Sequence, residues 1–140
     1  DRIKDMFKTS GGKYIAPQQI ETLLKEDFYI EQAAAIGDGR QFVSALVVPA
    51  FEALEGWLQK NGITYSSREE LIKKPEIIEF YRQRIDARTA DLGQVEKVKR
   101  FTLLPEDFTQ EGGELTPTQK LKRKVINEKY RSQIEAMYKD

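Results

Sequence analysis

The 140-residue sequence contains no cysteine and no histidine. The lack of cysteine excludes a disulfide framework, a thiolate nucleophile and a cysteine metal site, and it is typical of a reducing compartment such as the cytoplasm. The lack of histidine removes the usual general base at neutral pH and the commonest metal ligand. Any chemistry in this chain therefore has to use lysine, arginine, carboxylates or backbone amides.

The sequence also lacks an excess of either charge and any long apolar run. Lys and Arg together number 23, as do Asp and Glu, so the formal net charge is 0, and we expect no nucleic-acid partner. No stretch approaches the ~20 apolar residues of a membrane span, and no signal peptide is visible. A length of 140 residues suits one domain with its own core. Because the chain starts at Asp1 inside a patterned motif, we interpret it as a fragment of a longer protein.

The spacing of apolar and turn residues predicts an α+β domain, with a small antiparallel or mixed sheet, a hairpin and flanking helices. Gly11 and Gly12 indicate the turn of the hairpin, and Asp38-Gly39 is typical of a turn between two strands. The predicted elements are a hairpin at 1–15, a helix at 17–27, strands at 29–37 and 42–48, helices at 49–62 and 76–91, a strand at 95–104, a loop at 106–113 and a helix at 122–139.

The predicted helix at 76–91 has an apolar and a charged side. The residues predicted to face the core are Ile77, Ile78, Tyr81, Ile85 and Leu92. The residues predicted to face solvent are Arg82, Arg84, Asp86 and Arg88. Trp57 and Phe80 could line a ligand pocket together with Tyr81, but aromatic residues at helical spacing more often belong to the core.

The segment 114–124, ELTPTQKLKRK, places a lysine next to a turn. Pro117 is tolerated in the first turn of a helix with Thr116 as its cap, so the segment predicts the start of the helix at 122–139. Lys120 would then extend from the tip of a loop at the helix entrance. Two interpretations of this basic run remain open from the residues alone. The commoner one is a solvated helix face, and the other is a cation that contacts phosphate.

Two motifs, DRIKDMFKTSGGKYIAPQQIE at 1–21 and ELTPTQKLKRKVI at 114–126, carry a resemblance to a known family. Over essentially its whole length the chain resembles the carboxy-terminal domain of the adenylate-forming superfamily, which includes acyl-CoA synthetases, peptide-synthetase adenylation domains and luciferases. It is most similar to AMP-forming long-chain fatty-acid CoA ligases. The resemblance implies a single lid domain over 1–140, with a hinge and hairpin motif at 1–15 and an adenylation-lysine motif at 114–126. It also implies a large amino-terminal domain that this chain lacks.

The resemblance further implies roles for individual residues. Lys120 is implied as the catalytic lysine that reaches the nucleotide during adenylation, and Lys4 as the hinge, a position that family members fill with Asp or Lys. The implied contacts with ATP or AMP are those of Arg2, Lys8 and Lys120. The implied face for CoA and its pantetheine arm consists of Ser10, Gly11, Gly12 and Lys13. Asp1 departs from the family pattern, where many members have glycine, and the segment 61–94 is longer than in smaller relatives.

The implied reaction joins a long-chain fatty acid to CoA through an acyl-adenylate. It requires ATP, CoA and Mg2+, with the magnesium held mainly by the missing domain, so no metal ligand is expected here and the isolated fragment is expected to be inactive. A fixed cation such as Lys120 would stabilise the charge that develops on phosphoryl oxygens. Peripheral contact with a membrane is compatible with this interpretation. Two alternatives remain: the lid of another acyl-adenylating enzyme, of carrier-protein or peptide-synthetase type, and a non-enzymatic module whose basic helix binds anionic lipid or nucleic acid.

Overall fold

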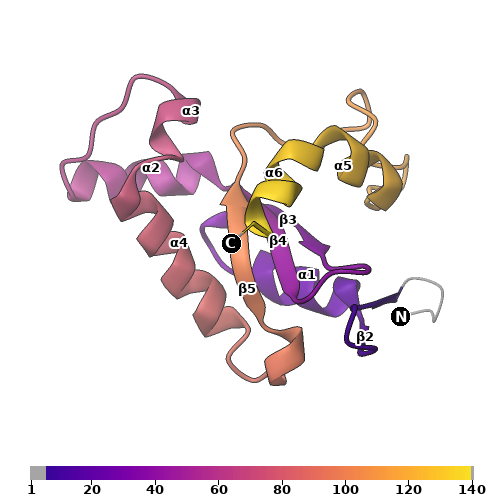
Figure 1. The fold of residues 1–140 in the computed structure, drawn as a ribbon. Helices are drawn as coiled ribbons and strands as arrows, with labels where there is room; N and C mark the ends of the chain where they lie inside the picture. The colour runs from indigo at the N-terminus through magenta and orange to yellow at the C-terminus, as the bar shows by residue number, and fades with distance from the viewer. Residues whose placement is uncertain (1–5, 140) are drawn as a thin grey trace.

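The computed structural model describes residues 6–139 of the chain. Figure 1 shows a central sheet flanked by helices, with a small hairpin at the amino-terminal end. Along the chain the strands and helices are β1 (Phe7–Lys8), β2 (Tyr14–Ile15), α1 (Pro17–Lys25), β3 (Ile30–Ile36), β4 (Val43–Pro49), α2 (Phe51–Lys60), α3 (Arg68–Leu71), α4 (Pro75–Arg88), the 3-10 helix η2 (Gln94–Glu96), β5 (Val98–Leu103), α5 (Arg123–Lys129) and α6 (Arg131–Met137). The predicted α+β class with a hairpin and a small mixed sheet is confirmed.

The sheet at the centre of the domain has three strands in the order β3-β4-β5. β3 and β4 pair antiparallel and are joined by a short turn, whereas β4 and β5 pair parallel. A parallel neighbour needs a long crossover connection, and helices α2, α3 and α4 supply it. Every residue of β4 is buried. This is the burial expected of a central strand in a sheet that is covered on both faces.

The two faces of the sheet carry two separate hydrophobic cores. Because side chains alternate along a strand, Ala45 and Val47 pack in one core and Leu46 and Val48 pack in the other. The first core also contains residues of α1, α2 and α4, and the second contains residues of α5 and α6. In Figure 1, α6 crosses in front of the sheet and α1 lies behind it. Full burial of each large aliphatic side chain contributes about 1.5–3 kcal/mol, so both helical layers stabilise the sheet.

The aromatic residues of α2 and α4 belong to the first core. The ring of Tyr81 is fully buried and its hydroxyl donates to the carbonyl oxygen of Tyr29 at 2.7 Å. The rings of Trp57 and Phe80 lie with their centroids 4.2 Å apart against the same core. Tyr81 is core as predicted, whereas Trp57 and Phe80 are half-buried and pack against that core, and Phe80 also lines a hollow beside α4.

The prediction of one continuous helix over 122–139 is wrong. α5 ends at Lys129, α6 begins at Arg131, and Tyr130 between them has φ −105° and ψ 26°, outside the α-helical range. The bend allows Ile126 of α5 and Ile134 of α6 to be buried in the same core, at 1% and 2% exposure. A straight helix would carry one of its halves away from the twisted sheet.

Thr116 and Pro117 do not begin a helix, contrary to the prediction. They form a turn in which the N–H of Gln119 donates to the carbonyl oxygen of Thr116 at 2.8 Å. Pro117 occupies the second position of this turn, which its fixed φ favours. The helix itself starts later, at Arg123.

Three expectations for α4 and β5 also need correction. Ile78 is 42% exposed and not in the core, because it lies off the stripe formed by the other apolar residues of α4. Arg84 and Arg88 are not simply solvated, since both contact the buried carboxylate of Asp27. Of the predicted strand 95–104, the first residues form η2, and β5 begins only at Val98.

Candidate functional site

A hollow of about 730 Å³ lies between α1, β3, the hairpin and the loop before α5. We call it the lysine hollow. Phe7 and Asp38 line it on the hairpin side, Glu21 lines it from α1, and Lys120 and Arg123 line it from the carboxy-terminal segment. Residues of both sequence motifs therefore meet at one hollow, although most of the chain separates the motifs.

Lys120 lies in a tight loop between Leu115 and Leu121, which form an isolated antiparallel bridge. Thr116 closes this loop. Its N–H donates to the carbonyl oxygen of Lys120 at 2.8 Å, and its hydroxyl accepts from the N–H of Lys120 at 3.1 Å. Gln119 has a φ of 66°, a left-handed conformation that is uncommon outside glycine. The backbone at Lys120 is thus fixed by its neighbours, and Lys120 is one of the residues that line the hollow.

Glu21 and Arg123 form an ion pair in the wall of the lysine hollow. The Glu21 carboxylate is 8% exposed and accepts hydrogen bonds from both terminal nitrogens of Arg123, at 2.6 and 2.8 Å. The same carboxylate accepts the backbone N–H of Ala35 in β3 at 2.8 Å. The first residue of α5 is therefore tied to α1 and β3, three residues after Lys120.

Glu114 holds the other end of the Lys120 loop. Its carboxylate is 1% exposed, accepts the N–H of Thr109 at 2.9 Å and contacts the ammonium of Lys129, while its carbonyl oxygen accepts the N–H of Lys122 at 2.7 Å. Burial alone would raise the pKa of Glu114, but hydrogen bonds from Lys129 and Thr109 outweigh burial and lower the pKa. The hydrogen bond to Glu114 raises the pKa of Lys129. Both partners therefore stay charged at neutral pH.

The hairpin β1–β2 docks on the turn that joins β3 to β4. The N–H of Ser10 donates to the carbonyl oxygen of Arg40 at 2.8 Å, and the N–H of Gly39 donates to the carbonyl oxygen of Lys8 at 2.8 Å. Gly37 allows the hairpin to lie close to this turn, because a Cβ at Gly37 would lie only 2.8 Å from Cε1 of Phe7. The position of the hairpin thus depends on the absence of a side chain in the neighbouring turn.

The two glycines at the hairpin tip have different structural roles. Gly12 has a φ of +87°, which favours glycine, so it is required by the turn itself. A Cβ at Gly11 would meet nothing within 4 Å. The fold therefore tolerates a side chain at Gly11, and any effect of one there would come from a molecule outside the domain.

The structure separates the predicted site residues into groups. Lys120 lines the lysine hollow, whereas Arg2 and Lys4 lie outside the described residues, and their roles stay predictions. The predicted residues of the hairpin that do not line this hollow are Lys8, Ser10, Gly11, Gly12 and Lys13. The hairpin tip is therefore not part of the lysine hollow, although Met6 and Phe7 at the start of the hairpin line it.

Sequence reasoning missed Glu21, Arg123, Glu114 and Gly37. Glu21 directly follows Ile20, at the edge of the apolar stripe of α1. An acidic residue beside an apolar stripe is the one local sign in the sequence of a buried carboxylate that has a cationic partner. In the sequence, nothing distinguishes Arg123 from the other members of the basic run. Its pairing with Glu21 depends on residues far away in the chain.

The described residues provide no metal site and no membrane span. In the range 6–139, no group of three or more His, Cys, Asp or Glu side chains is placed to hold a metal ion. Within the same range, no helix has the length and apolar character needed to cross a bilayer.

Solved structures with the same fold define the class of domain. The chain superimposes on the adenylation domain of a carboxylate reductase from Mycobacterium chelonae with a TM-score of 0.74 and 29% identity, covering 100% of this chain and 20% of that one. The A domain of a carboxylic acid reductase from Segniliparus rugosus, solved in complex with AMP, gives a TM-score of 0.77 over 99% of this chain and 20% of that one. Its identity of 24% supports the fold alone. The fold is that of the C-terminal subdomain of adenylate-forming enzymes.

The chain belongs to the AMP-binding enzyme C-terminal domain family, whose model matches residues 4–140. It is 40% identical over 138 residues to the long-chain-fatty-acid–CoA ligase FadD15 of Mycobacterium tuberculosis, covering 98% of this chain and 23% of that protein. It is 38% identical over 141 residues to human long-chain-fatty-acid–CoA ligase 1, covering 99% of this chain and 20% of that protein. The chain thus spans about a fifth to a quarter of the length of these relatives. The family implied by the two motifs is confirmed.

Proposed function

We propose that this chain is the mobile lid of an AMP-forming long-chain fatty-acid CoA ligase, and that Lys120 supplies a cation to its adenylation step. The observation that carries the proposal is the fixed loop that presents Lys120 to a hollow of about 730 Å³. The similarity to long-chain-fatty-acid–CoA ligases supports the substrate class. The substrates would be a long-chain fatty acid, ATP and CoA, bound together with Mg2+ mainly by an amino-terminal domain of the same protein.

In the first half-reaction the fatty-acid carboxylate attacks the α-phosphorus of ATP, and the bond to pyrophosphate breaks. Negative charge grows on the phosphoryl and leaving oxygens, and a cation aimed at them lowers the barrier. Lysine suits this task as a compact point charge. Because hydrogen bonds to Thr116 already fix the Lys120 backbone, little ordering of the loop backbone would be required when the lid closes.

In the second half-reaction the CoA thiol attacks the acyl carbonyl and AMP leaves. We assign the pantetheine contact to the hairpin tip, where Gly11 has open space around it. Because the tip residues do not line the lysine hollow, the lid would present each of these surfaces in a different orientation. The rotation would occur at Lys4, which lies outside the described residues, so Lys4→Pro should restrict the lid and lower overall turnover.

The test is ATP–pyrophosphate exchange with a long-chain fatty acid, run on the full-length protein and its Lys120→Ala variant. We expect exchange to fall by about 100- to 1,000-fold, which is typical for the loss of one transition-state stabiliser. Thioester formation from preformed acyl-adenylate should remain largely intact. Lys124→Ala is the matched control, because Lys124 is an exposed lysine of α5 that does not line the hollow.

Each outcome of this experiment has a separate meaning. An equal loss of rate in both half-reactions would contradict the role of Lys120. An unchanged rate of pyrophosphate exchange in Lys120→Ala would indicate that Lys120 is an ordinary solvated lysine of the basic run. An absence of exchange with every fatty acid would contradict the substrate class while leaving the fold and the family untouched.

The second candidate is the lid of an enzyme that transfers the acyl group to a carrier protein. The observation that favours it is the fold similarity to carboxylate reductase adenylation domains, one of them solved as an A-PCP didomain with a TM-score of 0.75. A comparison of thioester formation with CoA and with a phosphopantetheinylated carrier protein separates the two candidates. Transfer to the carrier protein alone would favour this second function.

A further inference from the structure

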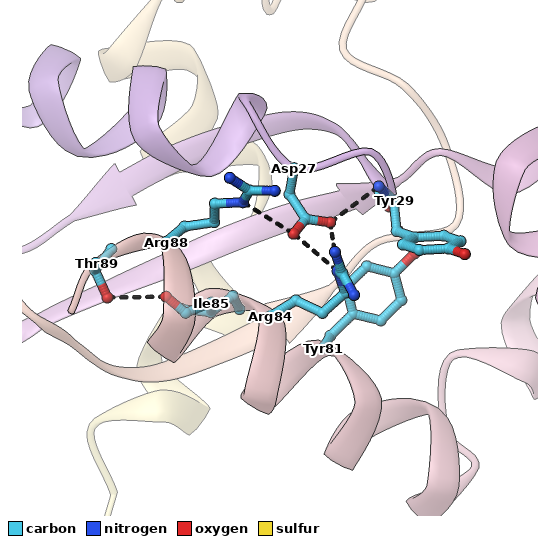
Figure 2. Close-up of polar contacts among 7 residues, drawn as sticks. All are labelled: Asp27, Tyr29, Tyr81, Arg84, Ile85, Arg88 and Thr89. Carbon is cyan, nitrogen blue, oxygen red and sulfur yellow. Dashed lines mark hydrogen bonds and ion pairs between the residues drawn. The ribbon is translucent and has the colours of Figure 1, made fainter.

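Asp27, Arg84 and Arg88 form a charged cluster on the face of the sheet opposite to α5 and α6 (Figure 2). The Asp27 side chain is only 1% exposed. It accepts the Arg84 Nε at 2.7 and 2.8 Å, the Arg88 Nε at 3.1 Å and the backbone N–H of Tyr29 at 2.9 Å. The two arginines are four residues apart on α4, so they extend from the same side of the helix.

Each arginine uses only its inner nitrogen for this contact. Arg84 and Arg88 both bind Asp27 through Nε, and in the part of the chain that the structure describes no hydrogen bond engages their terminal nitrogens. In Figure 2 a dashed line joins Asp27 to Nε of Arg88 and none joins it to the terminal nitrogens of Arg88. Two guanidinium groups against one carboxylate leave a net positive charge, with several N–H donors still available for a ligand.

The guanidinium of Arg84 is also held by aromatic rings. Its central carbon lies 4.8 Å from the centroid of the Tyr29 ring and 5.5 Å from that of Phe80. Burial alone would raise the pKa of Asp27, but hydrogen bonds from Arg84, Tyr29 and Arg88 lower it, so the carboxylate that orients both arginines stays charged. The donors are therefore ordered before any ligand arrives, which reduces the entropic cost of binding.

A hollow of about 300 Å³ lies beside this cluster, and we call it the arginine hollow. It is lined by Asp27, Arg84, Arg88 and their neighbours on α4, and it shares no lining residue with the lysine hollow. Phe28, next to Asp27, is 69% exposed and contacts the ring of Tyr29 edge to face. A large exposed apolar residue thus directly follows a lining residue of the hollow in the chain.

We propose that the arginine hollow binds a phosphate group, carried either by a soluble phosphate compound or by an anionic lipid headgroup. Arginine presents its N–H donors as a planar fork that matches phosphate oxygens. The hollow is separate from the surface that presents Lys120, so this would be a second anion site on the domain. A substitution of Phe28 distinguishes a lipid headgroup from a soluble phosphate compound. An exposed aromatic side chain strengthens binding to a membrane interface but not the binding of inorganic phosphate.

The test compares Arg88→Gln with Arg68→Gln in the full-length protein. Arg88→Gln removes one guanidinium while Asp27 keeps its hydrogen bonds from Arg84 and Tyr29. Arg68→Gln is the matched control, because it removes an equal charge from α3, where Arg68 lies over the Phe51 ring. Binding is measured by equilibrium dialysis with radiolabelled inorganic phosphate, and by co-sedimentation with vesicles of about three parts phosphatidylcholine to one part phosphatidic acid, at physiological salt.

We expect Arg88→Gln to weaken phosphate binding about tenfold and Arg68→Gln to leave it unchanged, as for the loss of one charge-assisted contact. Phosphate that binds at the nucleotide site contributes equally to the binding measured for both variants. The difference in binding between the two variants therefore measures the site on α4. A difference confined to vesicles, reduced again in Phe28→Ser, would identify a lipid headgroup as the source. If Arg88→Gln does not fold, Arg88→Lys keeps the charge without the fork and should show a smaller loss. Equal binding of both variants in both assays would overturn the proposal.

Discussion

The guanidinium of Arg123 binds the carboxylate of Glu21 through two hydrogen bonds of 2.6 and 2.8 Å, and so joins the start of α5 to α1. The pair lies in the wall of the hollow that Lys120 lines. Their position makes them positioning residues for the Lys120 loop.

Glu21→Gln should lower the rate of adenylation about tenfold, because a neutral amide holds Arg123 less firmly and Lys120 loses its fixed position. The informative measurement is pyrophosphate exchange in Glu21→Gln, Lys120→Ala and the double variant. If Glu21 acts through Lys120, the double variant should be no slower than Lys120→Ala alone. Additive losses would indicate that Glu21 affects the reaction by another route, such as general loss of stability.

Gly11→Leu should impair thioester formation more than adenylation. The fold has open space at this position, so the variant should unfold at the same urea concentration as the wild type. The added side chain would instead obstruct a pantetheine arm that passes close to the backbone. Single-turnover thiolysis of preformed acyl-adenylate and pyrophosphate exchange measure the two half-reactions separately, and a selective loss of exchange would refute the assignment of this surface.

Gly37→Ala should destabilise the docked hairpin by about 1–3 kcal/mol, because the new Cβ would lie 2.8 Å from Cε1 of Phe7. Gly56→Ala is its matched control. Gly56 lies inside α2 with nothing within 4 Å of an added Cβ, so alanine there should stabilise the chain by about 0.5–1 kcal/mol. Urea unfolding of the 140-residue chain measures both changes, and equal effects of the two substitutions would rule out the steric explanation.

Acidification should destabilise the chain partly through Glu114. Its folded pKa lies below the ordinary value of 4.5, so the stability that it contributes is complete above about pH 4.5 and is lost as the pH falls through the folded pKa. In Glu114→Gln the free energy of unfolding should be lower at neutral pH and should fall less steeply below pH 4.5. Urea unfolding across this pH range measures the slope, and parallel slopes in the two proteins would contradict the assignment.

Local patterns in the sequence predict most of the fold but not the contacts between its parts. The period of apolar residues predicts α1, β3, β4, α2 and α4, and Lys120 lies in a loop before the last helical segment as predicted, although Pro117 does not begin that helix. The break at Tyr130 could not be predicted, because it satisfies packing against the sheet and not a local preference. The same holds for Asp27 with Arg84, which are 57 residues apart, and for Glu21 with Arg123, which are 102 residues apart. Such pairs depend on tertiary structure, and the only local sign of them in the sequence is an acidic residue beside an apolar stripe.

The parallel pairing of β4 with β5 has a consequence for the order in which the domain can form during synthesis. β4 leaves the ribosome before α2, α3 and α4, and it stays without a neighbour on one edge until β5 follows them. Its second face stays uncovered even longer, until α5 and α6 are made. A nascent chain therefore exposes an apolar strand edge of the kind that promotes aggregation. Truncation before Arg123 would uncover that face permanently as well as disconnect the Lys120 loop from α1.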